Sequence, residues 1–133
     1  MSLTIPTSQS ERPELIRQLL KANLLSVFDE RDDISRKVAI ENTYAEDIIW
    51  YEPERLNQGQ DTLDRRAAEL LEESPGFRFQ PDGEMVVTQN LGVLHWKFGP
   101  VSDPGLLKGV DVILVVGGKI KALWTALTKV PGQ

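Results

Sequence analysis

The fold is decided between residues 107 and 128, where the chain reads LKGVDVILVVGGKIKALWTALT. Two runs rich in β-branched residues, 107–116 and 119–128, flank the pair Gly117-Gly118. Such runs favour β-strands, and glycines suit a two-residue hairpin turn because they adopt the positive φ angles that the turn requires. The stretch therefore predicts two antiparallel strands joined by a tight turn.

The turn also predicts the register of this hairpin. If Val116 faces Lys119, then Asp111 faces Trp124 and shares its side of the sheet with Ile113, because partners across an antiparallel pair lie on one face. Asp111 interrupts an otherwise apolar run. A carboxylate among apolar neighbours costs on the order of several kcal/mol unless it has a partner or faces a polar cavity. We therefore interpret Asp111 as a pocket residue.

The preceding strand, predicted over residues 92–98, would pair with the first strand of this hairpin. Pairing Phe98 with Lys108 places His95 opposite Asp111, whereas a one-residue slip would send the two side chains to opposite faces. His95 is the single histidine of the chain, and an imidazole beside a carboxylate can hold or relay a proton. His95 and Asp111 are thus the predicted catalytic pair, with a purely structural polar pair as the alternative. The side chains expected to line the pocket around them are Val93, Ile113 and Trp124.

The N-terminal half of the chain is mainly helical, because apolar residues recur there at three- and four-residue steps. The predicted helices cover residues 13–28, 34–45 and 61–73, and the predicted strands cover 48–51, 77–80, 84–89, 92–98, 107–116 and 119–128. Consecutive strands without helices between them pair antiparallel, and helices grouped on one face of such a sheet give an α+β arrangement. We expect a single domain over residues 13–133, preceded by a flexible leader over residues 1–12.

Three features occur together: the order of the elements, residues 44–53 (YAEDIIWYEP) before a glycine-containing loop and a helix, and strands that hold His95-Trp96 and Gly109-Val110-Asp111. With these features the chain resembles the nuclear transport factor 2-like superfamily, and within it the SnoaL-like polyketide cyclases and the ketosteroid isomerases. The resemblance implies a cystatin-like α+β barrel, in which a curved antiparallel sheet wraps around the N-terminal helices to form a cone-shaped pocket. It also implies a histidine and an aspartate in that pocket.

The resemblance points to Glu52 as a further catalytic candidate. In the isomerases a general-base carboxylate stands directly before the proline that ends the first strand, and here Glu52 precedes Pro53. The alternative for Glu52 is an exposed acid at a strand end. Of the neighbours Trp50 and Tyr51, one enters the pocket, since successive strand residues face opposite ways. Helix 13–28 has no tyrosine to match the isomerases' oxyanion donor, and this departure argues against classical steroid isomerisation.

The amino-acid composition argues against several kinds of binding site and partner. The chain has 133 residues with no cysteine, 20 acidic and 15 basic side chains, and a net charge of -5. Without cysteine and with one histidine the common transition-metal sites lack ligands, and no phosphate-binding glycine motif occurs, so we expect neither a metal nor a cofactor. Scattered basic residues argue against nucleic acid as a partner. We also expect no membrane span and no signal peptide, and therefore a cytoplasmic protein.

Two functions are open at this point, and both use a pocket for a small apolar ligand. The first is a cofactor-independent isomerase, cyclase or lyase that transfers protons on a small apolar carbonyl compound, with His95 and Asp111 as the acid/base pair. The second is a non-catalytic ligand-binding or association module of the same fold. The sequence leaves open whether the protein is an enzyme.

The convex face of the sheet is expected to form a homodimer interface. Residues 110–116 do not alternate apolar and polar side chains, which indicates that both faces of this strand are covered. The predicted helices cover one face, and an exposed apolar patch usually marks an interface. The residues predicted for this convex face are Leu94, Trp96, Val110, Val112, Leu123 and Thr125.

Overall fold

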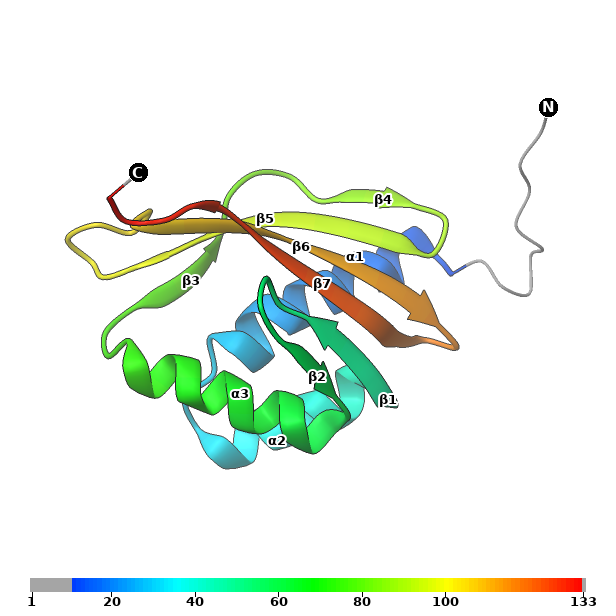
Figure 1. Cartoon of the computed structure of the whole chain (residues 1–133). Coiled ribbons are helices and arrows are strands. Elements are labelled where there is room, and N and C mark those ends of the chain that lie inside the picture. Colours follow the sequence, from blue (N-terminus) through cyan, green and yellow to red (C-terminus); the bar gives the residue numbers. More distant parts are fainter. Residues whose placement is uncertain (1–10, 133) are drawn as a thin grey trace.

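The computed structural model describes residues 11–132, whose helices all lie on one side of a curved sheet (Figure 1). Of the predicted flexible leader, residues 1–12, the first ten residues lie outside the described part of the chain. Glu11, near its end, is anchored: its Oε1 atom accepts a hydrogen bond from the Gly118 N–H at 2.9 Å. The chain therefore enters the fold beside the turn that the sequence singles out.

The first helix changes type along its length. The helices are α1 (Pro13–Lys21), η2 (Ala22–Phe28), α2 (Asp33–Thr43) and α3 (Gln60–Glu73). The prediction over residues 13–28 is right in extent, but its second half is a π-helix, in which the Asp29 N–H donates to the Leu24 carbonyl at 3.0 Å. Such turns are rare and often lie at functional sites. Within residues 11–132, no helix is long and apolar enough to cross a membrane.

The strands form one sheet, which confirms the predicted α+β class with a curved sheet packed on helices. They are β1 (Tyr44–Tyr51), β2 (Leu56–Gln58), β3 (Arg78–Pro81), β4 (Val86–Thr88), β5 (Leu91–Gly99), β6 (Leu107–Val116) and β7 (Lys119–Lys129). Their order is β2-β1-β7-β6-β5-β3, with β4 also paired to β5. β1 and β7 run parallel, whereas the four hairpin pairs and β3–β5 are antiparallel.

Two boundaries near residue 44 differ from the prediction. The helix expected over 34–45 ends at Thr43, and the strand expected over 48–51 begins at Tyr44. Tyr44 is only 1% exposed, so its ring belongs to the core of the sheet rather than to a helix surface. β2 lies in the segment expected to be a loop, because three residues are too few to show a period-two pattern.

The tight turn between β6 and β7 is confirmed. Gly117 and Gly118 have φ angles of 61° and 79°, and Val116 pairs with Lys119. Positive φ at both central residues matches the twist that joins adjacent antiparallel strands. The glycine pair therefore predicts both the position and the local register of this hairpin correctly.

A β-bulge beyond the turn changes the register of the rest of the hairpin. The register shifts between Leu114 and Val115, so that Asp111 pairs with Thr125 instead of Trp124. One extra residue in a strand reverses which side chains face each side of the sheet. The prediction that Trp124 lies beside Asp111 is therefore wrong, and Trp124 points outward with 41% of its surface exposed.

The register between β5 and β6 also differs from the prediction. His95 pairs with Val110, and Asp111 pairs with Leu94. Because paired residues share a face, His95 and Asp111 lie on opposite faces of the sheet. The predicted pairing of His95 with Asp111 is wrong, and His95 is exposed on the outer face.

The packing of β5 explains this register. Leu94, Trp96 and Phe98 alternate along the strand and are 2%, 5% and 6% exposed. Burying a large apolar side chain contributes about 1.5–3 kcal/mol, so three of them on one face outweigh any gain from turning His95 inward. His95 and Lys97, which lie between them, consequently face outward.

Of the six residues predicted for the convex face, two lie there and four lie on the concave side. Leu94, Trp96 and Leu123 are buried on the concave side, and Thr125 bonds to Asp111 there. Val110 and Val112 are on the outer face as expected. The residues that share this outer face by register are Ile49, Tyr51, Val86, Leu91, Val93, His95, Leu114, Ala122, Trp124 and Ala126.

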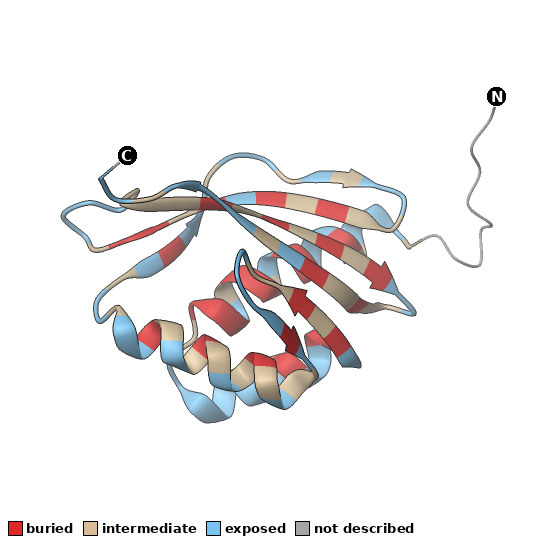
Figure 2. Cartoon of the chain, viewed as in Figure 1, coloured by how far each residue is buried: buried red, intermediate tan, exposed pale blue. Residues whose placement is uncertain are grey.

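The core lies between the concave face of the sheet and the helices, where Figure 2 shows most of the buried segments. The two helices that face each other, α2 and α3, are joined by a buried guanidinium group. Arg36 is 3% exposed; its Nε donates to Asp64 Oδ1 at 2.7 Å, and its terminal nitrogens contact Asp33 and the Glu30 carbonyl. Arg36 thus fixes α3, which forms one wall of the cavity described below.

Replacing Arg36 with methionine should lower the free energy of unfolding by about 3 kcal/mol, because the substitution leaves the carboxylate of Asp64 without its cation. Urea unfolding followed by circular dichroism measures this change. The matched control is Arg65→Met on the exposed side of α3, which should change stability by less than about 0.5 kcal/mol. Equal stability of the two variants would show that Arg36 does not hold the helices together.

Candidate functional site

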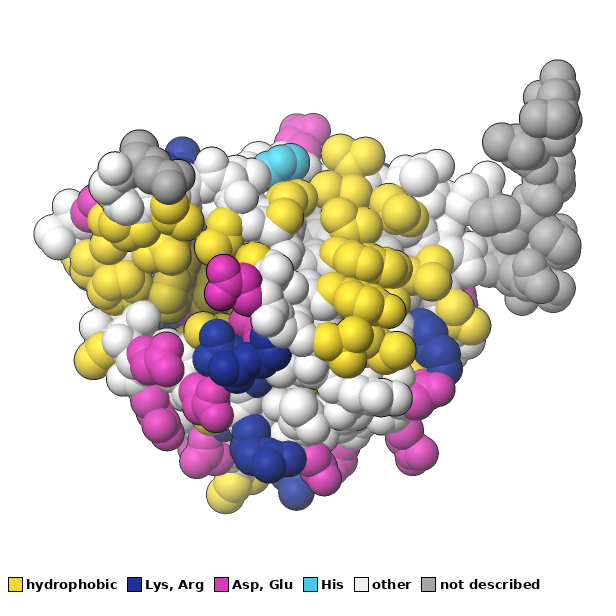
Figure 3. Space-filling model, in the orientation of Figure 1, with side chains coloured by type: hydrophobic (Ala, Val, Ile, Leu, Met, Phe, Trp, Pro, Cys, Tyr) yellow, Lys and Arg dark blue, Asp and Glu magenta, His cyan; other side chains and the backbone are white. Residues whose placement is uncertain are grey.

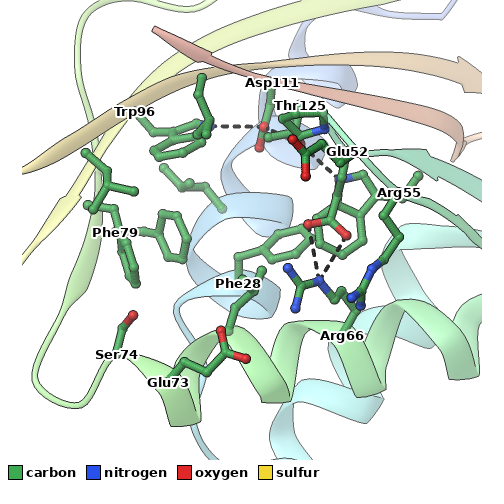
Figure 4. A pocket seen from close by; sticks show the side chains of 18 residues that line it. Phe28, Glu52, Arg55, Arg66, Glu73, Ser74, Phe79, Trp96, Asp111 and Thr125 are labelled. Carbon is green, nitrogen blue, oxygen red and sulfur yellow. Dashed lines mark hydrogen bonds and ion pairs between the residues drawn. The ribbon is translucent and has the colours of Figure 1, made fainter. Parts of the chain in front are cut away.

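A cavity of about 630 Å³ opens between the concave face of the sheet, η2 and α3. Figure 4 shows Asp111 and Thr125 at its sheet end, Phe28 and Phe79 along its walls, and Arg66 and Glu73 on α3 across from them. The lining residues are Leu24, Phe28, Trp50, Glu52, Pro53, Glu54, Arg55, Arg66, Leu70, Glu73, Ser74, Phe79, Trp96, Phe98, Leu107, Asp111, Thr125 and Leu127. Such a volume suits a small organic ligand.

Asp111 is the most buried charged group of this cavity, with 5% of its surface exposed. Its Oδ1 atom accepts hydrogen bonds from Trp96 Nε1 at 3.0 Å and Thr125 Oγ1 at 2.9 Å, and its Oδ2 atom accepts one from Asn23 Nδ2 at 2.9 Å. Burial raises the pKa of Asp111 to about 6, although the three donors oppose this shift. The carboxylate is therefore ionised near neutral pH yet binds a proton readily.

Two further side chains fix the donors of Asp111. The Tyr44 hydroxyl donates to Asn23 Oδ1 at 2.5 Å, which turns the amide nitrogen of Asn23 toward the carboxylate. Trp50 Nε1 donates to Thr125 Oγ1 at 3.0 Å, which leaves the threonine proton for Asp111. Burial, with a smaller effect of Asp111, raises the pKa of the Tyr44 hydroxyl well above its ordinary value, so Tyr44 stays a donor.

Local features of the chain position two of the side chains that donate hydrogen bonds to Asp111. Asn23 lies on η2 and is 1% exposed, so the wide π-helical turn presents a polar residue to the cavity floor. Trp96 lies across Gly109: a Cβ atom at Gly109 would stand 2.3 Å from Cζ2 of the indole ring. The missing side chain at Gly109 leaves room for the indole ring, whose N–H donates to Asp111.

The predicted ligand-binding residues divide between the two faces of the sheet. Trp50 lines the cavity and Ile113 lies in the core below it, fully buried. Tyr51 and Trp124 stack on the outer face, with ring centroids 5.3 Å apart, and Val93 shares that face. Of the neighbours Trp50 and Tyr51, the structure thus places Trp50 inside.

Glu52 lines the mouth of the cavity, and a cation holds it there. Arg66 Nε lies 3.0 Å and 3.2 Å from its two carboxylate oxygens, and Asn57 Nδ2 donates to Oε2 at 2.9 Å. Arg66 also pairs with Glu69 at 3.3 Å. The two predicted catalytic carboxylates therefore differ in kind: Glu52 is compensated by a guanidinium group, whereas Asp111 has neutral donors.

The surface around the mouth is mixed in character. Figure 3 shows acidic and basic side chains grouped at the middle of this side of the molecule, with hydrophobic side chains to either side of them. Arg55 and Glu69 form an ion pair of 3.5 Å at the rim. Among residues 11–132, no group of three histidine, cysteine, aspartate or glutamate side chains is placed to hold a metal ion.

The sequence analysis does not predict the hydrogen-bond partners of Asp111, although the sequence contains a pattern that indicates one of them, Trp96. Leu94-His95-Trp96-Lys97-Phe98 alternates apolar and polar residues, which places Trp96 inside and His95 outside. Asn23 is a polar residue within the apolar stripe of its helix. No short-range pattern joins Asn23 or Tyr44 to Asp111, because these contacts form only when helix and sheet pack together.

The comparisons with known proteins agree with this fold. No protein-family model matches the sequence, and neither does any curated protein. A candidate isomerase of the SnoaL-like family from Agrobacterium tumefaciens str. C58 is similar with a TM-score of 0.81 at 19% identity, over 87% of this chain and 99% of that chain. A candidate SnoaL-like polyketide cyclase from Jannaschia sp. CCS1 has a TM-score of 0.67 at 14% identity, over 89% and 90%.

A third solved structure, a protein with a cystatin-like fold from Methylobium petroleophilum PM1, has a TM-score of 0.73 at 11% identity, over 93% of this chain and 82% of that chain. At these identities the likeness establishes a shared fold. The predicted resemblance to SnoaL-like and cystatin-like proteins is confirmed at that level. The side chains of the cavity, rather than the fold, carry the functional argument.

The raised pKa of Asp111 predicts how stability depends on pH. Folded protein binds this proton more tightly than unfolded protein, so the stabilisation is complete below about pH 4 and is lost as pH rises to about 6. A shift of this size corresponds to about 3 kcal/mol. The variant Asp111→Asn lacks this titration and should be at least as stable as the parent protein near neutral pH.

Urea unfolding of both proteins across this pH range measures the effect. The parent free energy of unfolding, minus that of Asp111→Asn, should fall as pH rises and then level off. Taking this difference removes the contribution of the other carboxylates. A difference that stays constant with pH would show that Asp111 titrates as an ordinary exposed acid.

Proposed function

We propose that the protein is a cofactor-independent enzyme that transfers protons on a small apolar carbonyl compound, with Asp111 as the base. The observation that carries this proposal is the Asp111 carboxylate, buried at the floor of an aromatic-lined cavity with its pKa raised to about 6. A general base works best when its pKa lies near the working pH. The predicted role of His95 as its partner is withdrawn, because His95 is on the other face of the sheet.

The proposed reaction begins with removal of a proton from the carbon next to the carbonyl group. Asp111 takes the proton, the C–H bond breaks, and its electron pair moves into the enolate, so no oxidant or reductant takes part. Return of the proton at another carbon gives an isomer. Trp96, Thr125 and Asn23 hold the carboxylate in one orientation, which lowers the entropy lost when the substrate and the base align.

The same geometry supports a different role for Glu52. Both of its oxygens are engaged by Arg66, and Asn57 donates to one of them. Arg66 and Asn57 already occupy both carboxylate oxygens of Glu52, which restricts the access of a substrate to them. We therefore propose that Glu52 shapes the mouth of the cavity, and its role as the general base is the alternative within this proposal.

Exchange of the α-protons of the carbon acid 2-tetralone in deuterium oxide, followed by NMR, tests the proposal. The protein should accelerate exchange, and Asp111→Asn should reduce the acceleration by at least about 100-fold. The rate should rise as pH increases through about 6 and then level off, because the base must be ionised. Glu52→Gln should retain most of the activity.

The outcomes separate the competing functions. Equal exchange rates for the parent protein and Asp111→Asn would remove Asp111 as the base. Binding of 2-tetralone without any accelerated exchange would favour the non-catalytic ligand-binding module of the same fold. Loss of exchange in Glu52→Gln alone would move the base to Glu52.

We further propose that two copies of the chain pack through the outer face of the sheet. β6 presents Val110, Val112 and Leu114 there, each half-buried, and Tyr51 and Trp124 form a stacked pair beside them. In Figure 3 hydrophobic side chains gather in a column over the strands. A second copy related by a two-fold axis would cover this face with the same apolar surface.

Sedimentation equilibrium at micromolar protein concentration tests this assembly. The parent protein should have about twice the chain mass of 14.9 kDa, and Trp124→Glu should shift it to the single chain mass because the charge would be buried in the interface. The control is Val101→Glu, at a residue that is 91% exposed and lies in the loop after β5, outside the paired strands. A parent protein with the mass of one chain would contradict the proposal.

A further inference from the structure

In the part of the chain that the structure describes, no opposite charge lies beside the carboxylate of Asp111. Its hydrogen-bond donors are an amide, an indole and a hydroxyl group, all neutral, and none of the ion pairs formed within residues 11–132 involves Asp111. A carboxylate removed from water is favourable only when it has compensation, and here one side of that carboxylate faces a cavity. A cation that enters the cavity would supply the missing compensation.

The other charged residues of the cavity also favour a cation. Four of its lining residues are carboxylates, Glu52, Glu54, Glu73 and Asp111, and two are arginines. One of these arginines, Arg66, is already paired with Glu52 and Glu69. Carboxylates therefore outnumber arginines among the lining residues, which favours cations over anions in the cavity.

Aromatic rings surround the route to Asp111. Phe28 and Trp50 meet edge to face with centroids 4.8 Å apart, and Phe79 packs against Trp96 in the same way at 5.3 Å. All four line the cavity. Aromatic side chains stabilise organic cations through their electron-rich faces. A quaternary ammonium group has no N–H donor, so it needs no hydrogen-bond acceptor from these apolar walls.

From these three features we propose that the cavity binds an organic ammonium ion with an apolar body, whose charged head is held by the carboxylate of Asp111. This binding activity goes beyond the proposed proton transfer and does not depend on it. It requires an ionised Asp111 facing the cavity, whether or not that group acts as a base. In an active enzyme such a cation would compete with the carbonyl substrate.

Two ligands of the same shape test the inference. Benzyltrimethylammonium carries the charge, and neopentylbenzene replaces its nitrogen with carbon. The indole N–H signals in heteronuclear NMR spectra report where they bind, because Trp50 and Trp96 line the cavity while Trp124 lies on the outer face. The cation should shift the signals of Trp50 and Trp96, leave that of Trp124 unchanged, and bind at least about tenfold more tightly than its carbon isostere.

Asp111→Asn should remove this preference, so that both ligands bind with similar affinity. Glu46→Gln, which removes the same charge at an exposed position on β1, should leave the preference intact. In the parent protein, affinity for the cation should increase by up to about tenfold per pH unit as pH rises toward about 6, whereas the neutral ligand should show no such gain. The other charged groups of the cavity, Glu52, Glu54, Glu73, Arg55 and Arg66, remain in Asp111→Asn, which separates their effect from that of Asp111.

Three results would overturn the inference. They are no binding of the cation at millimolar concentration, equal affinity for the two ligands in the parent protein, or an equal loss of affinity for the cation and for its carbon isostere in Asp111→Asn. Each is distinct from failure of the proposed enzyme. A protein that binds the cation through Asp111 but does not exchange the protons of 2-tetralone keeps this inference and loses the catalytic one. The reverse result keeps catalysis and removes the ammonium site.

Discussion

The arrangement of this protein depends on keeping one carboxylate, that of Asp111, away from water. Desolvation works against its charge, and three neutral donors offset part of that penalty. Each donor comes from a different element: Asn23 from η2, Trp96 from β5 and Thr125 from β7. The group at the floor of the cavity therefore ties η2 to strands β5 and β7 of the sheet.

The sequence predicts the order of the helices and strands well because that order depends on local sequence patterns. The glycine pair at 117 and 118 and the change from helical to strand periodicity both lie within a few residues. The register of the strands is harder to predict, since β6 has apolar residues on both of its faces and either face could be turned to the core. The alternation of β5 around His95 held the missing information, because it requires Trp96 inside. The bulge beside Val115 left no recognisable pattern, so the position of Trp124 followed only from the three-dimensional structure.

Asp111 itself was predictable as a buried group, whereas its partners were not. A lone acid in a run of valine, isoleucine and leucine stands out in any single sequence. Trp96 and Thr125 lie on neighbouring strands, 15 and 14 positions away, but which of their faces meets Asp111 depends on the register; Asn23 is 88 positions away, and Tyr44 contacts it only through Asn23. A histidine appeared the natural partner because it is unique in the chain. The structure instead uses an amide, an indole and a hydroxyl group, which stabilise a charge without titrating near neutral pH.

The two carboxylates of the cavity show how position separates their chemistry. Glu52 and Asp111 carry the same functional group, and one cavity exposes both. Glu52 lies at the mouth with Arg66, so its charge is cancelled where water enters. Asp111 lies at the floor, where the cation is missing and the pKa rises to about 6. Because Asp111 has no cation beside it among the described residues, it is the carboxylate that we expect to respond to a ligand or a proton. Chemistry at this site therefore follows from the position of a carboxylate without a neighbouring cation, and the aromatic side chains around Asp111 lower the polarity of its surroundings, which strengthens electrostatic interactions there.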